Sequence, residues 1–408
     1  MAISRGPFRP THPRYSRLRD SLGNSERRLV LSNLFSGSIH ELLHPPSGQI
    51  PFLDGLRTIA ILLVVNAHLS ARFSQTFGSN SFSRLPFVTN GWIGVDLFFI
   101  LSGFFIGGQL WKEIQRTGTV AVGRFILRRG FRIWPLYFFT FLCVFVWSLA
   151  FGNGLAAKGF GWSDLIFATN YVNHGIVMGS WSLCTEEQFY IVVPLLLFYF
   201  ASRTPSLRNY RRWLWVVLLS VPLLRAVIWI CYTGHFFVHD PQLFASIYYA
   251  SFTHCDGLIM GLIISNLWIA REHPKGKFAS PWPLMIVATL LAAALYVIQK
   301  EIFDFTTLAL LFGALAWLGL QHRLAIFNAK PFYWISRLSF GMYLNHEYMG
   351  PWLVQSLPPN LIALLHSPIL ANFLVFCLLT LMSAAVSLVT FCLVEHPFLQ
   401  MRKVVLGH

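Results

Sequence analysis

The chain of 408 residues is too apolar to be a soluble domain of ordinary composition. Hydrophobic residues make up 55% of it and charged residues only 12%, and its mean hydropathy is +0.57. The formal net charge of +15 does not indicate nucleic-acid binding, because the basic residues fall in short clusters between hydrophobic runs, as in cytoplasmic loops. The composition therefore predicts a polytopic membrane protein and excludes a nucleic-acid partner.

Ten hydrophobic segments are each long enough to cross a bilayer as a helix. They cover about residues 52–71, 91–111, 133–151, 183–201, 213–233, 245–270, 283–300, 305–321, 332–356 and 369–394. Lys and Arg gather in every second connection, whereas the intervening loops carry almost none. We therefore expect an all-α transmembrane bundle of about ten spans, with both termini in the cytoplasm.

The transmembrane domain is expected over residues 49–400, between two cytoplasmic tails. Residues 1–48 are polar and rich in Arg and Ser, without an apolar core of signal-peptide length, so we expect a largely disordered basic tail and no cleaved leader. Residues 401–408 are expected to form a short tail, and Pro397 to end the last span. No further domain is expected after His408.

Six cysteines are scattered through the predicted spans without the spacing of a zinc site or a disulfide framework. They are Cys143, Cys184, Cys231, Cys255, Cys377 and Cys392. We interpret them as small apolar packing residues, and we expect no metal.

The first segment, FLDGLRTIAILLVVNAHLS, carries ionisable residues that a purely structural span does not need. Arg57 stands near its start, and His68 follows about 16 Å further along the helix axis. His68 is thus expected within the far half of the bilayer, where an ionisable side chain is costly and is by default a functional candidate. For this helix alone, a neutral imidazole that hydrogen-bonds between packed helices is the alternative.

Two further segments carry carboxylates close to their starts. Asp96 lies just inside the second segment, among small residues that let helices approach closely. Glu186 and Glu187 open the fourth, where adjacent helical side chains point about 100° apart, so at most one of them readily faces a given site. Trp181 and Tyr190 could offer stacking surfaces to a sugar ring, although aromatic residues near a membrane interface are usually anchors.

Arginine side chains gather before the third segment, in RFILRRGFRIWPLY. Arg128 and Arg132 fall on one helical face, and Arg129 lies beside Arg132. A guanidinium group binds phosphate oxygens in bidentate fashion, so this array suits a polyphosphate ligand such as acyl-coenzyme A. For any one of these arginines, the alternative is that it only sets the topology.

Polar residues also interrupt later segments. Arg225 lies in the middle of the fifth segment, His254 and Asp256 lie in the sixth, and Asn345-His346-Glu347 interrupt the ninth. Some of these residues are expected to form buried ion pairs that take no part in catalysis.

Taken in order, these motifs resemble the acyltransferase-3 family of integral-membrane acyltransferases over roughly residues 50–400. The resemblance rests on LDGLR followed by His68, GVDLFFILSGFFI, RRGFRIWPLY, SWSLCTEEQFY, CDGLIMG, LSFGMYLNH and Glu395-x-Pro397. It implies that His68 is the catalytic histidine and Arg57 the basic member of an Arg-x10-His pair. It also implies that Arg129 and Arg132 serve the acyl donor at the cytoplasmic face.

The sequence departs from the family pattern in two details. Cys184-Thr185 precede the acidic pair, and Asn345 stands before His346 where an aromatic residue is more usual. Neither departure removes a group that the chemistry needs.

The resemblance implies an enzyme of the bacterial inner membrane that transfers an acyl group, most simply acetyl, from acyl-coenzyme A. The acceptor it implies is a sugar hydroxyl of a cell-envelope polysaccharide, an exported polysaccharide or a glycoconjugate. His68 would act as general base, oriented by Asp96, Glu187 or another acid, and Arg57 or a backbone amide would stabilise the charge on the thioester oxygen. A covalent acyl-histidine route stays open. A transporter or flippase of a lipid-linked or small-molecule substrate is the alternative, and the absence of a visible internal repeat weakens it.

Overall fold

The protein is an all-helical membrane protein in the part of the chain that the structure describes. The computed structural model describes residues 37–46, 48–152, 159–172, 175–201, 206–272, 282–322, 325–357 and 367–407. Most of these residues are helical and none is in a strand, and seven of the described helices are long and apolar enough to cross a membrane. The chain is therefore a multi-pass integral membrane protein. The expected basic tail lies, up to residue 36, outside the described residues.

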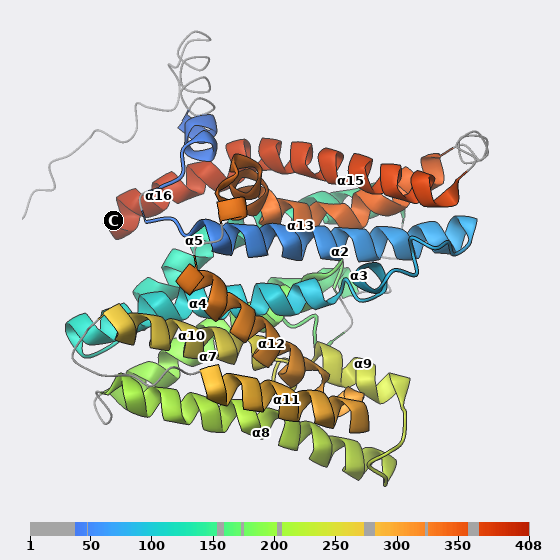
Figure 1. Cartoon of the computed structure of the whole chain (residues 1–408). Coiled ribbons are helices and arrows are strands. Elements are labelled where there is room, and N and C mark those ends of the chain that lie inside the picture. Colours follow the sequence, from blue (N-terminus) through green and yellow to red (C-terminus); the bar gives the residue numbers. More distant parts are fainter. Residues whose placement is uncertain are drawn as a thin grey trace, which may run out of the picture.

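Most of the helices run side by side in one bundle (Figure 1). In chain order they are α2 Pro51–Phe77, α3 Pro86–Thr89, α4 Ile93–Thr117, α5 Val122–Phe151, α6 Trp162–Leu165, α7 Ser180–Ala201, α8 Leu207–Thr233, α9 Pro241–Tyr249, α10 Asp256–Glu272, α11 Trp282–Ile298, α12 Lys300–His322, α13 Lys330–Ser356, α15 Pro368–Thr390 and α16 His396–Leu406. Short 3-10 turns at Gly159–Gly161 and Ala325–Asn328 and a π-helix at Phe391–Glu395 complete the described elements.

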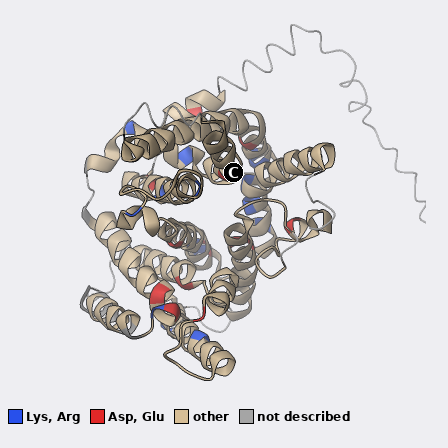
Figure 2. Ribbon diagram, turned by 90° about the vertical axis from the view of Figure 1, so that its right-hand side faces the viewer, with Lys and Arg blue, Asp and Glu red and all other residues tan. Residues whose placement is uncertain are grey.

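The helices α2 and α4 form the inside of the bundle, whereas α5 and α8 face outward. Of the apolar stretch of each helix, 61% is buried in α2 and 67% in α4, against 17% in α5 and 28% in α8. Figure 2, which looks along most of the helices, shows that Lys, Arg, Asp and Glu are sparse among the uncharged residues. The most protected residues therefore lie on α2 and α4, and α5 reaches the interior only through a few buried residues, which include Arg129.

Glycine residues let the central helices approach one another at backbone distance. A Cβ atom built on Gly103 would lie 2.1 Å from the Leu258 carbonyl oxygen of α10, and one built on Gly94 would lie 2.5 Å from the Ala60 carbonyl oxygen of α2. No larger side chain fits at these positions without a shift of backbone. The expectation that small residues around Asp96 mark a close helix crossing is confirmed.

The segment expected as one span over 245–270 is instead two helices, α9 and α10, which a non-helical stretch at 250–255 separates. A side chain from another helix supplies a hydrogen bond to the backbone of this stretch, since Arg225 Nη1 donates to the Thr253 carbonyl oxygen at 2.7 Å. Non-helical backbone at membrane depth is stable where protein groups supply such partners. The single-helix prediction was wrong because hydrophobicity along the chain does not report this contact from another helix.

Two helices extend beyond their predicted boundaries. α5 begins at Val122 rather than near residue 133, so the arginines of RFILRRGFR lie on the same continuous helix as the apolar span. α15 continues through the π-helix into α16, so Pro397 does not end the last span. Pro397 occupies the first turn of α16, where a missing N–H is tolerated.

The first and last described stretches lie at the same end of the bundle (Figure 1). Glu41, in the helical turn at 37–43, forms an ion pair with His396 at 3.4 Å and a shorter one with Arg337 at 2.6 Å. The first and last described stretches are therefore in direct contact at this end of the bundle.

Candidate active site

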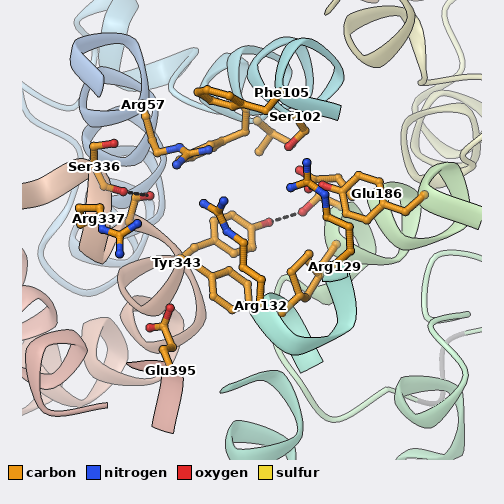
Figure 3. Close-up of a pocket in the computed structure, with 18 of the residues that line it drawn as sticks. Arg57, Ser102, Phe105, Arg129, Arg132, Glu186, Ser336, Arg337, Tyr343 and Glu395 are labelled. Atoms are coloured by element: carbon orange, nitrogen blue, oxygen red, sulfur yellow. Dashed lines mark hydrogen bonds between the residues drawn. The ribbon is translucent and has the colours of Figure 1, made fainter. Parts of the chain in front are cut away.

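A cavity of about 120 Å³ lies inside the bundle, between α2, α4, α5, α7, α13 and the π-helix that leads to α16. Four arginines and two carboxylates line it: Arg57, Arg129, Arg132, Arg337, Glu186 and Glu395. We call it the arginine cavity. The guanidinium groups of Arg57, Arg129 and Arg132 point into the same space from three different directions (Figure 3).

Three of these arginines have no acidic ion-pair partner among the described residues. Arg129 is buried, and its Nε and Nη2 atoms have no hydrogen-bond partner there. Aromatic rings flank the charges instead: the Arg129 guanidinium carbon lies 5.7 Å from the Tyr190 ring centre, and that of Arg57 lies 5.2 Å from the Phe105 ring centre. Unpaired guanidinium groups away from bulk water are unfavourable, so the cavity favours an anionic ligand.

The two adjacent glutamates of α7 point into different surroundings, as their helical spacing predicts. Glu186 lines the arginine cavity, where its Oε2 atom accepts a hydrogen bond from the Tyr190 hydroxyl at 2.5 Å. Glu187 is buried outside the cavity lining, and its Oε2 atom accepts a hydrogen bond from Trp134 Nε1 at 2.9 Å. Only Glu186 can therefore contact a ligand in the cavity.

A second polar centre lies further along α2, at His68. The His68 Nδ1 atom is 2.9 Å from Glu347 Oε1 and 2.9 Å from His346 Nε2. His346 Nδ1 is 3.0 Å from the Met342 carbonyl oxygen. We call His68, His346 and Glu347 the histidine cluster.

The hydrogen bonds of the histidine cluster assign its protons. A carbonyl oxygen only accepts, so His346 Nδ1 carries a hydrogen and, in the neutral ring, His346 Nε2 is an acceptor. The hydrogen between the two rings then belongs to His68 Nδ1, which also faces the Glu347 carboxylate. In neutral His68 the Nε2 atom is left with its lone pair and without a proton. This is the state that a general base requires.

The same three side chains are also a possible cation site, since their ligand-type atoms all lie within 4.8 Å of one another. The two contacts of His68 Nδ1 are 2.9 Å each, which is a hydrogen-bond distance. Two ligands that each lie 2.0–2.1 Å from a tetrahedral metal are about 3.3 Å apart. The spacing fits direct hydrogen bonds better than a metal between the ligands.

Asp96 does not belong to the histidine cluster. Its Oδ1 atom lies 3.0 Å from His254 Nε2, and both side chains are fully buried. Trp181 packs its ring 5.7 Å from the His254 ring and does not line the arginine cavity. Of the acids expected to orient His68, neither Asp96 nor Glu187 is the one beside it. The alternative of another acid matches the structure, in which Glu347 lies beside His68.

The two centres occupy different heights of α2. Arg57 lies in the arginine cavity, whereas His68 is three helical turns further on, at an axial distance of about 16 Å. Arg57 therefore lies with Arg129 and Arg132 in the arginine cavity. It does not lie beside the His68 ring, where its expected contact with the thioester oxygen would be needed. Arg128 was expected with Arg129 and Arg132, but it does not line the cavity.

Several site residues carried only a weak signal in the sequence. Arg337 and Glu395 line the arginine cavity, yet the sequence shows Arg337 only as one of the basic residues between segments and Glu395 only as part of the last motif. Glu347 interrupts an apolar segment, and this interruption is the sequence signal that could have identified it. Arg225 and Asp256 form a buried ion pair at 2.8 Å, as expected for residues without a catalytic part.

Comparisons with known proteins place these centres in a family. A family model described as "Acyltransferase domain" matches residues 50–392. The peptidoglycan O-acetyltransferase OatA of Listeria monocytogenes is 26% identical over 328 residues, which is 73% of this chain and 49% of that protein. The O-acetyltransferase OatA of Staphylococcus aureus strain NCTC 8325 is 27% identical over 234 residues, 54% of this chain and 35% of that protein.

A third relative is the putative peptidoglycan O-acetyltransferase YrhL of Bacillus subtilis, 25% identical over 338 residues, which is 76% of this chain and 49% of that protein. The chain thus spans about half the length, or less, of the curated relatives that it matches. No solved structure matches the chain. Because the family model covers residues 50–392, which include the four arginines of the arginine cavity and the histidine cluster, the chain belongs to the acyltransferase-3 family.

Proposed function

We propose that this protein is a membrane O-acetyltransferase that moves an acetyl group from acetyl-coenzyme A to a sugar hydroxyl of a cell-wall polysaccharide. Two matched relatives, a peptidoglycan O-acetyltransferase and a putative peptidoglycan O-acetyltransferase, support the reaction and the class of acceptor. The observation that carries the proposal is the contact of His68 Nδ1 with Glu347 and His346, which leaves His68 Nε2 unprotonated.

His68 is the proposed general base. Its Nε2 atom takes the proton of the sugar hydroxyl as the hydroxyl oxygen attacks the thioester carbonyl carbon. The tetrahedral intermediate then expels the coenzyme A thiolate, which recovers the proton from His68. Glu347 stabilises the imidazolium that exists between these two proton transfers, since its carboxylate lies 2.9 Å from Nδ1.

The arginine cavity is the proposed site for the phosphate groups of the donor. Arg57, Arg129 and Arg132 supply guanidinium groups without acidic partners among the described residues, and such groups bind phosphate oxygens strongly. Arg57 is thus assigned to donor binding, together with Arg129 and Arg132. The pantetheine arm of the donor then carries the thioester along α2 toward His68.

The acceptor hydroxyl is proposed to reach His68 from the opposite side of the histidine cluster. The His68 side chain is 44% exposed, whereas the neighbouring His346 is buried. Entry of donor and acceptor from opposite ends of α2 is consistent with a cytoplasmic donor and a cell-wall acceptor.

The direct test is transfer of radiolabelled acetyl from acetyl-coenzyme A to soluble peptidoglycan fragments by the purified protein in liposomes. His68→Ala is expected to abolish transfer while donor binding is retained. Arg129→Ala/Arg132→Ala is expected to weaken donor binding at least about tenfold, because each charge-assisted hydrogen bond contributes about 1.5–3 kcal/mol. Arg124→Ala, an exposed arginine of the same helix outside the cavity, is the matched control.

Donor binding that is lost only in the double variant, together with transfer that is lost in His68→Ala, would support two separate centres. Substantial transfer by His68→Ala would contradict its role as base. Failure of the wild-type protein to bind acetyl-coenzyme A would contradict the proposed donor and favour the transporter alternative, which requires no acyl donor.

A further inference from the structure

The lining of the arginine cavity does not reach the histidine cluster. His68, His346 and Glu347 are absent from the cavity lining, although His346 is only one helical turn beyond Tyr343 on α13. Tyr343 lines the cavity, and its ring centre lies 5.9 Å from the His346 ring centre. Tyr343 therefore contacts both centres and stands between them.

Phe98 completes this layer from the opposite helix. The Phe98 and Tyr343 ring centres are 6.3 Å apart in an edge-to-face arrangement, and both side chains line the cavity. Phe98 is near the start of α4 and Ser182 near the start of α7, whereas Phe105, which lies beside Arg57, is two helical turns beyond Phe98 on α4. The two rings thus make up the part of the cavity lining that adjoins His346 through Tyr343, and we call this pair the wall.

The Tyr343 ring is held in place by hydrogen bonds of its hydroxyl group. The hydroxyl donates to the Gly179 carbonyl oxygen at 3.0 Å. Its single hydrogen is then committed, so it accepts from the Ser182 hydroxyl at 2.5 Å. Gly179 directly precedes α7 and Ser182 is in its first turn, so the position of the Tyr343 ring is tied to the start of α7.

If the phosphates of acyl-coenzyme A are bound in the arginine cavity, its thioester end must pass this wall to reach His68 Nε2. We propose that Tyr343 and Phe98 form a gate between the donor cavity and His68, and that Tyr343 limits the donor to short acyl groups. The role of the gate in acyl transfer rests on the proposed function. That the two rings block access from the cavity to His68 can be tested without it. Opening requires the Tyr343 ring to turn away from Phe98, and its hydroxyl to leave Ser182 and Gly179.

The gate predicts the choice of acyl chain. In a tight apolar passage each added methylene changes discrimination by about 10- to 200-fold. Tyr343→Ala removes the ring, so the ratio of kcat/KM for butyryl- over acetyl-coenzyme A is expected to rise at least about tenfold. Tyr343→Phe keeps the ring and removes both hydrogen bonds, so it is expected to change the rate with acetyl-coenzyme A but to alter the ratio little.

Tyr348 on the same helix provides the matched control. Its hydroxyl also bonds to the segment before α7, since it accepts from Met178 N at 2.8 Å and donates to the Ile176 carbonyl oxygen at 3.2 Å. Tyr348 does not line the arginine cavity. Tyr348→Ala is therefore expected to leave the acyl-chain ratio unchanged.

A second measurement tests access without catalysis. The His68→Cys variant places a thiol at the histidine cluster, and a membrane-impermeant maleimide added separately to each face of sealed vesicles labels it. The same protein with His68 unchanged gives the background labelling of the six natural cysteines. Tyr343→Ala or Phe98→Ala in the His68→Cys background is expected to raise the labelling rate from the face on which the arginines open, while the rate from the other face stays unchanged. Phe98→Ala opens the same wall from α4 and replaces Tyr343→Ala if that variant does not fold.

Unchanged labelling and an unchanged acyl-chain ratio in folded Tyr343→Ala and Phe98→Ala would overturn the gate. Faster labelling in a protein whose wild type does not turn over acyl-coenzyme A would support the gate and contradict the proposed function. The two proposals therefore fail separately.

Discussion

The His68 Nδ1 atom lies 2.9 Å from the Glu347 Oε1 atom, across the interface between α2 and α13. A carboxylate at this position holds the imidazole in one orientation and stabilises its protonated form. The contact also keeps the proton on Nδ1, so the opposite nitrogen is the one that meets a substrate. The reactivity that we propose for His68 therefore depends on a residue of another helix.

Glu347→Gln is expected to lower kcat about 10- to 100-fold, a part of the 10²–10⁴-fold that a positioned general base contributes. Glutamine can still accept the hydrogen bond of His68 Nδ1, but it has no charge to stabilise the imidazolium. KM for acetyl-coenzyme A is expected to stay unchanged, because Glu347 does not line the arginine cavity. Steady-state kinetics with acetyl-coenzyme A and peptidoglycan fragments measures both constants.

The control for this variant is a second histidine–glutamate pair, in which His239 lies in the non-helical stretch before α9 and Glu301 lies on α12. Glu301→Gln removes the same charge from the same type of pair and is expected to leave kcat unchanged. Equal losses in both variants would mean that the effect of Glu347→Gln is not specific to His68.

Glu41→Gln is expected to strengthen donor binding about two- to fivefold. Glu41 forms an ion pair with Arg337 at 2.6 Å, and Arg337 lines the arginine cavity. The pair is partly exposed, and such pairs contribute about 0.2–1 kcal/mol, so its removal leaves Arg337 available to an anionic ligand at small cost to stability. Isothermal titration with coenzyme A measures the change, and weaker binding would show that Glu41 positions Arg337 for the donor instead.

Arg225→Leu is expected to destabilise the protein by about 3–5 kcal/mol, because it leaves the Asp256 carboxylate buried without its partner. The double variant Arg225→Leu/Asp256→Leu removes both charges and is expected to recover part of this loss. Unfolding in detergent, followed by circular dichroism, compares the two. A double variant less stable than Arg225→Leu would mean that Asp256 stabilises the fold through groups other than Arg225.

Gly103→Ala is expected to lower the unfolding temperature, because its Cβ would lie 2.1 Å from the Leu258 carbonyl oxygen. Backbone atoms cannot yield cheaply, and strain of this kind typically costs about 1–3 kcal/mol. Gly108→Ala on the same helix has no atom within 4 Å of the added Cβ, so it serves as the control and is expected to be neutral or slightly stabilising. Similar unfolding temperatures for the two variants would show that α4 and α10 can move apart freely.

The positions of single residues along one helix could be predicted from the sequence alone. The rise of an α-helix separates Arg57 from His68 by about 16 Å whatever surrounds them. The turn of 100° per residue likewise makes Glu186 and Glu187 face different surroundings, and Glu186 alone lines the arginine cavity. These relationships lie within one element, so its geometry determines them.

The continuity of the helices was predicted less well. The break between α9 and α10 depends on Arg225, and the extension of the last span depends on a π-helix that brings Pro397 into a first helical turn. A hydrophobic run indicates that a segment is buried in lipid or protein. It does not indicate whether a neighbour satisfies backbone groups where the helix is interrupted.

The sequence by itself determined the class of the protein, its all-helical architecture and the residue types of both centres, because hydrophobic length and helical periodicity are local properties. Only the tertiary structure decided which acid meets His68. Asp96 is paired with His254, Glu187 with Trp134, and the partner of His68 is Glu347. His68 and its neighbour His346 are 278 residues apart in sequence, and they meet because close packing brings α2 against α13. Periodicity identifies the face of a helix that is buried, but the partner across that face is set by how all the helices fit together.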